Sequence, residues 1–167
     1  MYMAEQYGEP EWCVGLGIRN THRMAIAPTK STALIMGGIS EGINPDPAMT
    51  FVQPTASGEI NRVNPALLRI MKSKGLYDKK HIQELVDNQG SVQSVSWLND
   101  HEKDVFKHAF EIAQEIFIDM ASSRQLHLDQ GQSLNLFINA DEDEEYIAYL
   151  HKKAFLDPYI TSLYYCY

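Results

Sequence analysis

The segment that decides the fold reads Met24-Ala25-Ile26-Ala27-Pro28-Thr29-Lys30-Ser31-Thr32-Ala33-Leu34-Ile35-Met36-Gly37-Gly38. A short apolar run ends at a proline, hydroxyl-bearing residues follow, and a second apolar run begins. This order predicts a buried strand over residues 24–27, a tight turn and the beginning of a helix. The first N–H groups of a helix lack intrahelical partners and carry the positive end of its dipole, so this turn could bind an anion.

The side chains of the turn are suited to a phosphate ligand. Thr29, Ser31 and Thr32 provide hydroxyl donors, and Lys30 provides a full positive charge. The segment is not a Walker loop, because the glycines that such a loop needs before its Lys-Ser/Thr pair are missing. A plainer interpretation is that Thr29 or Ser31 only caps a structural helix. The spacing alone leaves both interpretations open.

Length and composition indicate an ordinary globular chain. Its 167 residues are enough for one domain, with 44% hydrophobic and 22% charged residues. No apolar tract is long enough to cross a membrane, and residues 1–10 do not resemble a secretory leader. We therefore expect a cytoplasmic location.

Cysteine usage and net charge narrow the possible ligands. Cys13 and Cys166 lie near opposite ends of the chain without a Cys-x-x-Cys pair, which predicts neither a zinc site nor a disulfide framework. A net charge of −8 with scattered Lys and Arg residues argues against binding to a nucleic-acid polymer. A small phosphate ligand held by one local turn stays compatible with this charge.

Caps and periodicity predict several helices. Asn64 before Pro65, with Gly75 further on, predicts a helix over residues 65–74. A second helix is predicted over residues 79–87. A third, the longest, begins at Asn99 with Glu102 at its third position. We expect it to continue through a buried apolar stripe formed by Phe106, Ala109, Phe110, Ala113, Ile116, Phe117 and Met120.

Strand signals lie between and after these helices. Residues 50–53 and 59–63 flank turn formers and predict a small hairpin. Ser133–Ile138 has the composition of a buried strand, and the β-branched and aromatic residues of Ile160–Tyr167 predict a further strand. The acidic run Asp141–Glu145 could suggest a metal site. Consecutive carboxylates point around a helix, however, so we predict no metal and assign the acids to the first turn of a helix whose far end is basic.

The order of these elements predicts an α/β fold with parallel strands joined by right-handed crossovers. Residues 1–16 show no periodicity, and we expect them to form a flexible N-terminal arm. Residues 17–167 would form the folded part.

Several short motifs resemble one enzyme family in the same order along the chain. Residues 17–20 and 27–33 resemble the phosphate-binding segment of the large (alpha) subunit of class I ribonucleotide reductase. Further family landmarks are Ser57-Gly58-Glu59, Val63-Asn64-Pro65, Gly90-Ser91-Val92-Gln93-Ser94, Asp129-Gln130, Gln132-Ser133-Leu134-Asn135 and Leu163-Tyr164-Tyr165. Because the family's large subunit is several times longer, the resemblance covers only its C-terminal portion. It implies the closing strands and helices of a ten-stranded α/β barrel, incomplete without the upstream part.

The resemblance implies two groups of site residues for the reduction of ribonucleotides to deoxyribonucleotides. The phosphates of a ribonucleoside diphosphate would be held by Pro28, Thr29, Lys30, Ser31 and Thr32. Family members differ at the position of Lys30. Tyr164 and Tyr165 would relay a radical, Tyr165 receiving it from the small (beta) subunit and Tyr164 passing it toward the catalytic cysteine. Successive residues of a regular strand point to opposite faces, so this pair requires a distortion of the strand. Cys166 and Tyr167 have no implied role.

Cofactors and partners are also implied by the resemblance alone. This chain would bind no cofactor itself, whereas the family needs a dimetal or radical cofactor in the beta subunit, dNTP or ATP effectors and a thiol reductant. The catalytic cysteine loop and the C-terminal cysteine pair have no counterpart in this sequence. We therefore expect the isolated chain to be inactive and to act with an upstream alpha-subunit polypeptide and the beta subunit. The alternatives are a non-enzymatic nucleotide- or phosphate-binding module, and an inactive relic or interaction domain.

Overall fold

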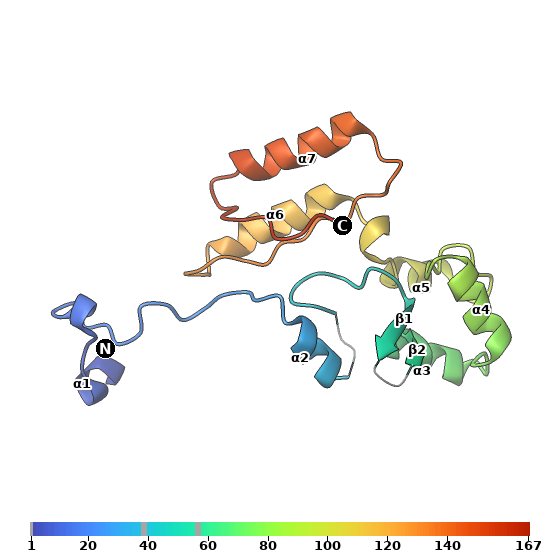
Figure 1. Cartoon of the computed structure of the whole chain (residues 1–167), viewed down its shortest axis with the longest axis horizontal. Coiled ribbons are helices and arrows are strands. Elements are labelled where there is room, and N and C mark those ends of the chain that lie inside the picture. Colours follow the sequence, from blue (N-terminus) through green and yellow to red (C-terminus); the bar gives the residue numbers. More distant parts are fainter. Residues whose placement is uncertain (1, 38–39, 56–57) are drawn as a thin grey trace.

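The computed structural model describes residues 2–37, 40–55 and 58–167, without the side chains of Leu34 and residues 53–61. The elements are α1 (Tyr2–Tyr7), η1 (Glu11–Cys13), α2 (Lys30–Ile35), β1 (Thr50–Thr55), β2 (Gly58–Val63), α3 (Pro65–Ser73), α4 (Lys79–Asp87), α5 (Asp100–Val105), η2 (Ala109–Glu111), α6 (Gln114–Gln125) and α7 (Glu144–Leu156). Figure 1 shows α1 and the short turn η1 away from the remaining helices, connected to them by an extended segment. The predicted division at residue 16 stays a prediction.

Residues 49–106 form what we call the hairpin lobe. In it β1 and β2 pair as antiparallel strands, in register from Thr50 opposite Val63 to Thr55 opposite Gly58. This confirms the predicted hairpin, although turn residues 56 and 57 lie outside the described residues. Helices α3, α4 and α5 complete the lobe (Figure 1). Its buried core consists of Met49, Leu67, Met71, Leu85, Val92, Val95, Leu98 and Phe106.

The local signals for α3 and α4 are confirmed. The Asn64 side chain accepts hydrogen bonds from the N–H groups of Ala66 and Leu67, and Pro65 occupies the first helical position. Gly75 follows the helix with a φ of 70°, the left-handed conformation that glycine adopts without steric cost. Helix α4 spans Lys79–Asp87, the range that its sequence predicts.

The single long helix predicted from Asn99 is wrong. Its capping box forms between Asn99 and Glu102, but α5 ends at Val105 and the chain continues as η2 and then α6. The Glu111 carboxylate accepts a hydrogen bond from the N–H of His108 and so begins a new turn. At this point the Ala109 N–H also bonds to the Asp46 carbonyl instead of a preceding helical carbonyl.

This break changes which residues are buried. Phe106 and Ala109 belong to the core as predicted, but Ile116 and Met120 are about half exposed, whereas Ile118 and Ala121 are buried. The predicted stripe assumed one continuous helical phase across residues 106–120. The turn between α5 and α6 resets that phase. Ala113, Ile116 and Met120 are therefore exposed, while Phe117 still packs against the core beside α6.

Helices α6 and α7 pack with three extended segments, residues 24–26, 130–138 and 160–167, in what we call the strand lobe (Figure 1). Its buried core consists of Ile118, Ala121, Leu134, Leu136, Leu150 and Ala154. The three segments run parallel, as predicted, with the middle segment 130–138 bonded to both others. Each contact is an isolated bridge, Ile26 with Gln132 and Leu136 with Cys166, rather than the longer ladder expected of full strands.

The acidic run leads into a helix, as predicted. The Asp143 side chain accepts a hydrogen bond from the Glu145 N–H, Glu144 and Glu145 occupy the first turn of α7, and Lys153 lies in its last turn. These charges complement the helix dipole. Across residues 2–37, 40–55 and 58–167, no group of three His, Cys, Asp or Glu side chains could hold a metal ion. Over the same ranges, no helix has the length and apolar character needed to span a bilayer.

Candidate functional site

The phosphate-binding candidates lie where the first extended segment turns into α2. The Asp129 carboxylate accepts hydrogen bonds from the N–H groups of Arg23 and Met24, which fixes the beginning of residues 24–26. These two bonds, Met24 first, lower the pKa of Asp129, so the group is ionised at neutral pH. Segment 24–26 then runs beside residues 130–133, and α2 begins at Lys30 as the sequence predicts.

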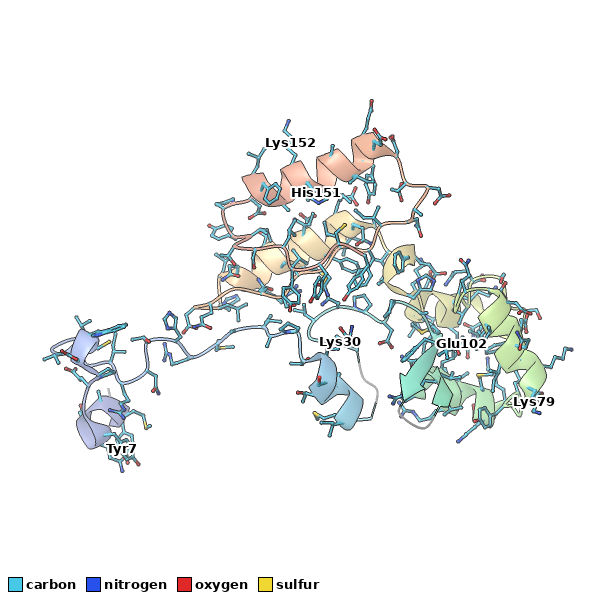
Figure 2. All side chains as sticks on the ribbon, in the orientation of Figure 1. Tyr7, Lys30, Lys79, Glu102, His151 and Lys152 are labelled. Atoms are coloured by element: carbon cyan, nitrogen blue, oxygen red, sulfur yellow. The ribbon has the colours of Figure 1, made fainter. Side chains whose placement is uncertain are left out.

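The turn itself is open to solvent. Thr29, Lys30, Ser31 and Thr32 are exposed and Pro28 is half-buried. Thr29 adopts a φ of 51°, unusual for a residue with a branched side chain. Its hydroxyl oxygen accepts a hydrogen bond from the Gly42 N–H at 2.8 Å, so this oxygen points to the following loop. The five candidate residues therefore form one contiguous surface at the beginning of α2, where Figure 2 shows Lys30.

The loop after α2 folds back onto this turn. Lys30 Nζ lies 3.7 Å from Glu41 Oε1, a largely solvent-exposed ion pair of small energetic weight. Gly42 approaches the backbone so closely that a Cβ there would lie 2.8 Å from the Ala27 carbonyl oxygen. Its φ of 54° adds to the requirement for glycine. An anion binding at Lys30 would compete with Glu41 for the ammonium group.

The two candidate tyrosines lie at an irregularity in the last extended segment. The Leu134 carbonyl accepts from the Tyr164 N–H at 2.8 Å, and the Leu136 carbonyl accepts from the Tyr167 N–H at 2.9 Å. The tyrosine segment therefore advances three residues while the facing segment advances two, which is the one-residue excess of a β-bulge. The Tyr165 N–H, displaced from the ladder, donates instead to Asn135 Oδ1 at 3.2 Å.

This bulge brings the two phenol rings together. The ring centroids of Tyr164 and Tyr165 are 4.2 Å apart with an interplanar angle of 52°, a contact that a regular strand would not allow between neighbours. The Tyr165 phenol raises the pKa of Tyr164, first through a side-chain hydrogen bond and second through its charge. Tyr164 is therefore neutral at physiological pH. Both rings are about half exposed.

Tyr167 extends the aromatic contacts, although sequence reasoning gave it no role. Its ring centroid lies 5.6 Å from that of Tyr165 and stacks on Phe137 at 5.3 Å with an interplanar angle of 18°. Phe137 in turn contacts Phe110 edge-on at 5.4 Å. The aromatic repeat at positions 165 and 167 was the available signal, since alternate strand residues share a face.

Two asparagines were also missed as site residues. Asn44 and Asn135 are buried and bond to each other and to the backbone near the candidate residues. The sequence signal for Asn135 was its place inside the apolar run Leu134-Asn135-Leu136. A buried side-chain amide there needs hydrogen-bond partners. The phosphate candidates thus follow the outer segment 24–26 and the tyrosines lie on the other outer segment, whereas Asn135 lies on the middle segment and Asn44 contacts it from the loop after α2.

Comparisons with known proteins identify the family. Residues 12–165 match the model of the ribonucleotide reductase barrel domain. The chain is 38% identical over 164 residues to the ribonucleoside-diphosphate reductase large subunit of Invertebrate iridescent virus 6. It is 35% identical over 146 residues to large chain 2 of Saccharomyces cerevisiae. The chain therefore belongs to the ribonucleotide reductase barrel-domain family.

A solved structure agrees with this assignment. The class Id ribonucleotide reductase alpha subunit of Actinobacillus ureae superposes with a TM-score of 0.81 at 33% identity. The match covers 99% of this chain and 30% of that one. The viral match covers 95% of this chain and the yeast match 84%, but each covers only 17% of the relative. This chain thus spans a minor part of the proteins that it resembles, and its α/β character follows from the family.

Proposed function

We propose that this chain is the C-terminal portion of a ribonucleoside-diphosphate reductase alpha subunit. It would contribute the substrate phosphate segment and a radical-transfer tyrosine pair to an active site completed by the rest of the ten-stranded barrel. The observation that carries the proposal is the bulge at Tyr164 and Tyr165, which brings two phenol rings into contact on one segment of the barrel family's fold. The beta subunit, its metal or radical cofactor, the effectors and the thiol reductant would come from elsewhere in the assembly.

The exposed turn supports the assignment of the phosphate residues. Backbone N–H groups at the beginning of α2, the hydroxyls of Ser31 and Thr32, and the Lys30 ammonium can all donate to phosphate oxygens. Such contacts do not read the base, which suits an enzyme that accepts several nucleotides. Replacing Ser31 and Thr32 by alanine should cost about 1–3 kcal/mol of substrate affinity for each lost donor. Unchanged affinity in the double variant would refute this assignment.

The ring contact supports the radical-transfer assignment. A neutral phenol releases an electron and a proton together, so two adjacent phenols can divide one long transfer into two shorter steps. Tyr165 would receive from the beta subunit, and Tyr164 would pass the radical to the catalytic cysteine of the upstream part.

Phenylalanine variants separate radical transfer from packing, because they keep the ring and remove only the hydroxyl. Tyr164→Phe and Tyr165→Phe should each bind substrate normally in the assembled enzyme and lose turnover. Ordinary turnover by Tyr164→Phe would leave only a packing role for that residue.

The outer segments of the strand lobe support association with the missing barrel part. In the described residues, segments 24–26 and 164–167 make parallel backbone bonds on the side of the middle segment only. Open strand edges and exposed apolar side chains favour pairing with another chain. Completing the barrel should bury roughly 2,000 Å² or more.

The association can be tested by expressing this chain alone and with a polypeptide that carries the catalytic cysteine loop. We expect co-expression to raise solubility, to give a complex of the summed mass and, with a beta subunit, to give ribonucleotide reduction. A monomer that neither binds that polypeptide nor restores activity would favour a phosphate-binding module. The Gly42 to Thr29 bond would support that second function, since this chain builds the turn unaided.

A further inference from the structure

Asn44 occupies the place that a strand residue would take beside the middle segment. Ile26 donates its N–H to the Gly131 carbonyl and accepts from the Ser133 N–H. If this parallel register continued, the N–H of residue 28 would donate to the Ser133 carbonyl. The carbonyl of residue 28 would accept from the Asn135 N–H. Proline at position 28 has no N–H to donate.

The Asn44 side chain makes both of these bonds to the middle segment. Its Nδ2 donates to the Ser133 carbonyl at 3.4 Å, and its Oδ1 accepts from the Asn135 N–H at 3.2 Å. The same Nδ2 also lies 3.4 Å from the Glu41 carbonyl. Asn44 lies on the loop that folds onto residues 28–32, which we call the phosphate turn. Its buried carboxamide thus replaces a backbone peptide group.

Asn135 continues the connection to the tyrosines. Its N–H bonds to Asn44, and its own Oδ1 accepts from the Tyr165 N–H that the bulge displaces. Without this acceptor the Tyr165 N–H would have no hydrogen-bond partner. The tyrosine segment would then regain a backbone partner for this group by shifting to the regular strand register. Regular register would turn the Tyr164 and Tyr165 rings to opposite faces.

We infer that Asn135 and Asn44 are positioning residues that fix the tyrosine pair relative to the phosphate turn. Asn135 maintains the bulge, and Asn44 joins the middle segment to the loop that carries Glu41 and Gly42. An anion that displaces Glu41 from Lys30 shifts this loop, and the shift reaches Tyr165 through the two carboxamides. The catalytic consequence rests on the proposed function, whereas the hydrogen-bond connection does not.

The connection is tested first in the full chain without substrate. Asn135→Ala should accelerate hydrogen exchange of the Tyr165 amide by about ten-fold and abolish the ring-to-ring contact seen by NMR. Asn135→Asp keeps the acceptor oxygen and should restore both. The matched control is Gln132→Ala, on the same segment, because this buried carboxamide bonds to Ala121 and Gln125 instead. Equal changes in Asn135→Ala and the control would overturn the inference.

The link to the phosphate turn is tested with inorganic pyrophosphate as the probe. In the unmodified chain, saturating pyrophosphate should shift the Tyr165 amide resonance. In Asn44→Ala the shift should disappear while pyrophosphate affinity changes less than about three-fold. A shift that persists in Asn44→Ala would overturn the coupling. If pyrophosphate does not bind the chain, the proposed phosphate site fails, whereas the exchange experiment still decides the role of Asn135.

A measurement in the assembled enzyme separates positioning from simple stability. Misplacement of Tyr165 should lower kcat by about ten- to one hundred-fold in Asn135→Ala without raising KM. Ser31→Ala should show the opposite pattern, with the larger change in KM. An Asn135→Ala enzyme with unchanged kcat would contradict the positioning role, even if its stability were reduced.

Discussion

The hairpin lobe and the strand lobe differ in how far apart in the sequence their paired backbone segments lie. In the hairpin lobe, each residue of β1 pairs with a residue of β2 that lies three to thirteen positions further along the chain. In the strand lobe, partners come from residues 24–26, 130–138 and 160–167, and each pair shares one isolated bridge. Antiparallel strands can be joined by a short turn, whereas parallel strands need longer crossover connections. The pairing of the hairpin lobe is therefore local in sequence, whereas that of the strand lobe joins segments far apart in the chain.

The largest expected difference between the lobes is in hydrogen exchange on assembly. Pairing of segments 24–26 and 164–167 with new strands should slow exchange there by more than about one hundred-fold, because open edges exchange by local fraying. Amides of α3 and α4 should change little. The measurement compares the chain alone with its complex with the upstream polypeptide. Equal protection of both lobes in the free chain would refute the contrast.

Core truncations test whether the lobes unfold separately. Leu67 and Leu150 are each fully buried, one in each core. Leu67→Ala should lower the free energy of unfolding of the hairpin lobe by about 2–5 kcal/mol, through lost burial and a cavity. Trp97, packed against that core, reports the transition in urea by fluorescence in a Trp12→Phe background. Leu150→Ala should leave this transition in place; an equal shift would mean one cooperative unit.

Removal of the α3 cap should have an intermediate effect. Asn64→Ala removes the acceptor for two helical N–H groups and the donor to Asp46 Oδ2 at 2.7 Å, and should cost about 1–2 kcal/mol by urea unfolding. Asn64→Ser retains a capping oxygen and serves as the control, with a smaller loss. If the two variants lose equal stability, the bond to Asp46 and not the cap accounts for the effect.

The smallest expected effect is a pH dependence from His108. Burial lowers the pKa of this imidazole from its ordinary value near 6.5, and the nearby Glu111 carboxylate offsets part of the change. Because the unfolded chain takes up the proton at higher pH, this stability is present above pH 6.5 and is lost as pH falls through the folded pKa. His108→Gln should flatten the acid side of a stability profile. An unchanged profile would exclude His108 as its source.

Sequence reasoning succeeded where structure is set by neighbouring residues. The caps at Asn64 and Asn99, the hairpin and the beginning of α2 follow from side chains within a few positions. It failed at residues 106–120, because the break depends on a bond from Ala109 to Asp46, which is distant in sequence. Asn44 escaped notice for the same reason, since its partners are some ninety residues away. The phosphate turn was predicted from its own residues, whereas its nucleotide ligand and the roles of Tyr164 and Tyr165 came from resemblance to the family.

The exchange of a peptide group for the Asn44 carboxamide has a consequence for sequence variation. Proline at position 28 directs the chain out of the sheet and toward α2, and Asn44 compensates for the N–H that proline lacks. A residue with an N–H at position 28 would reduce the need for Asn44, whereas loss of Asn44 beside Pro28 would leave buried polar groups without partners. Substitutions at these two positions should therefore be interdependent. In relatives we expect them to change together, although they lie sixteen positions apart in the sequence.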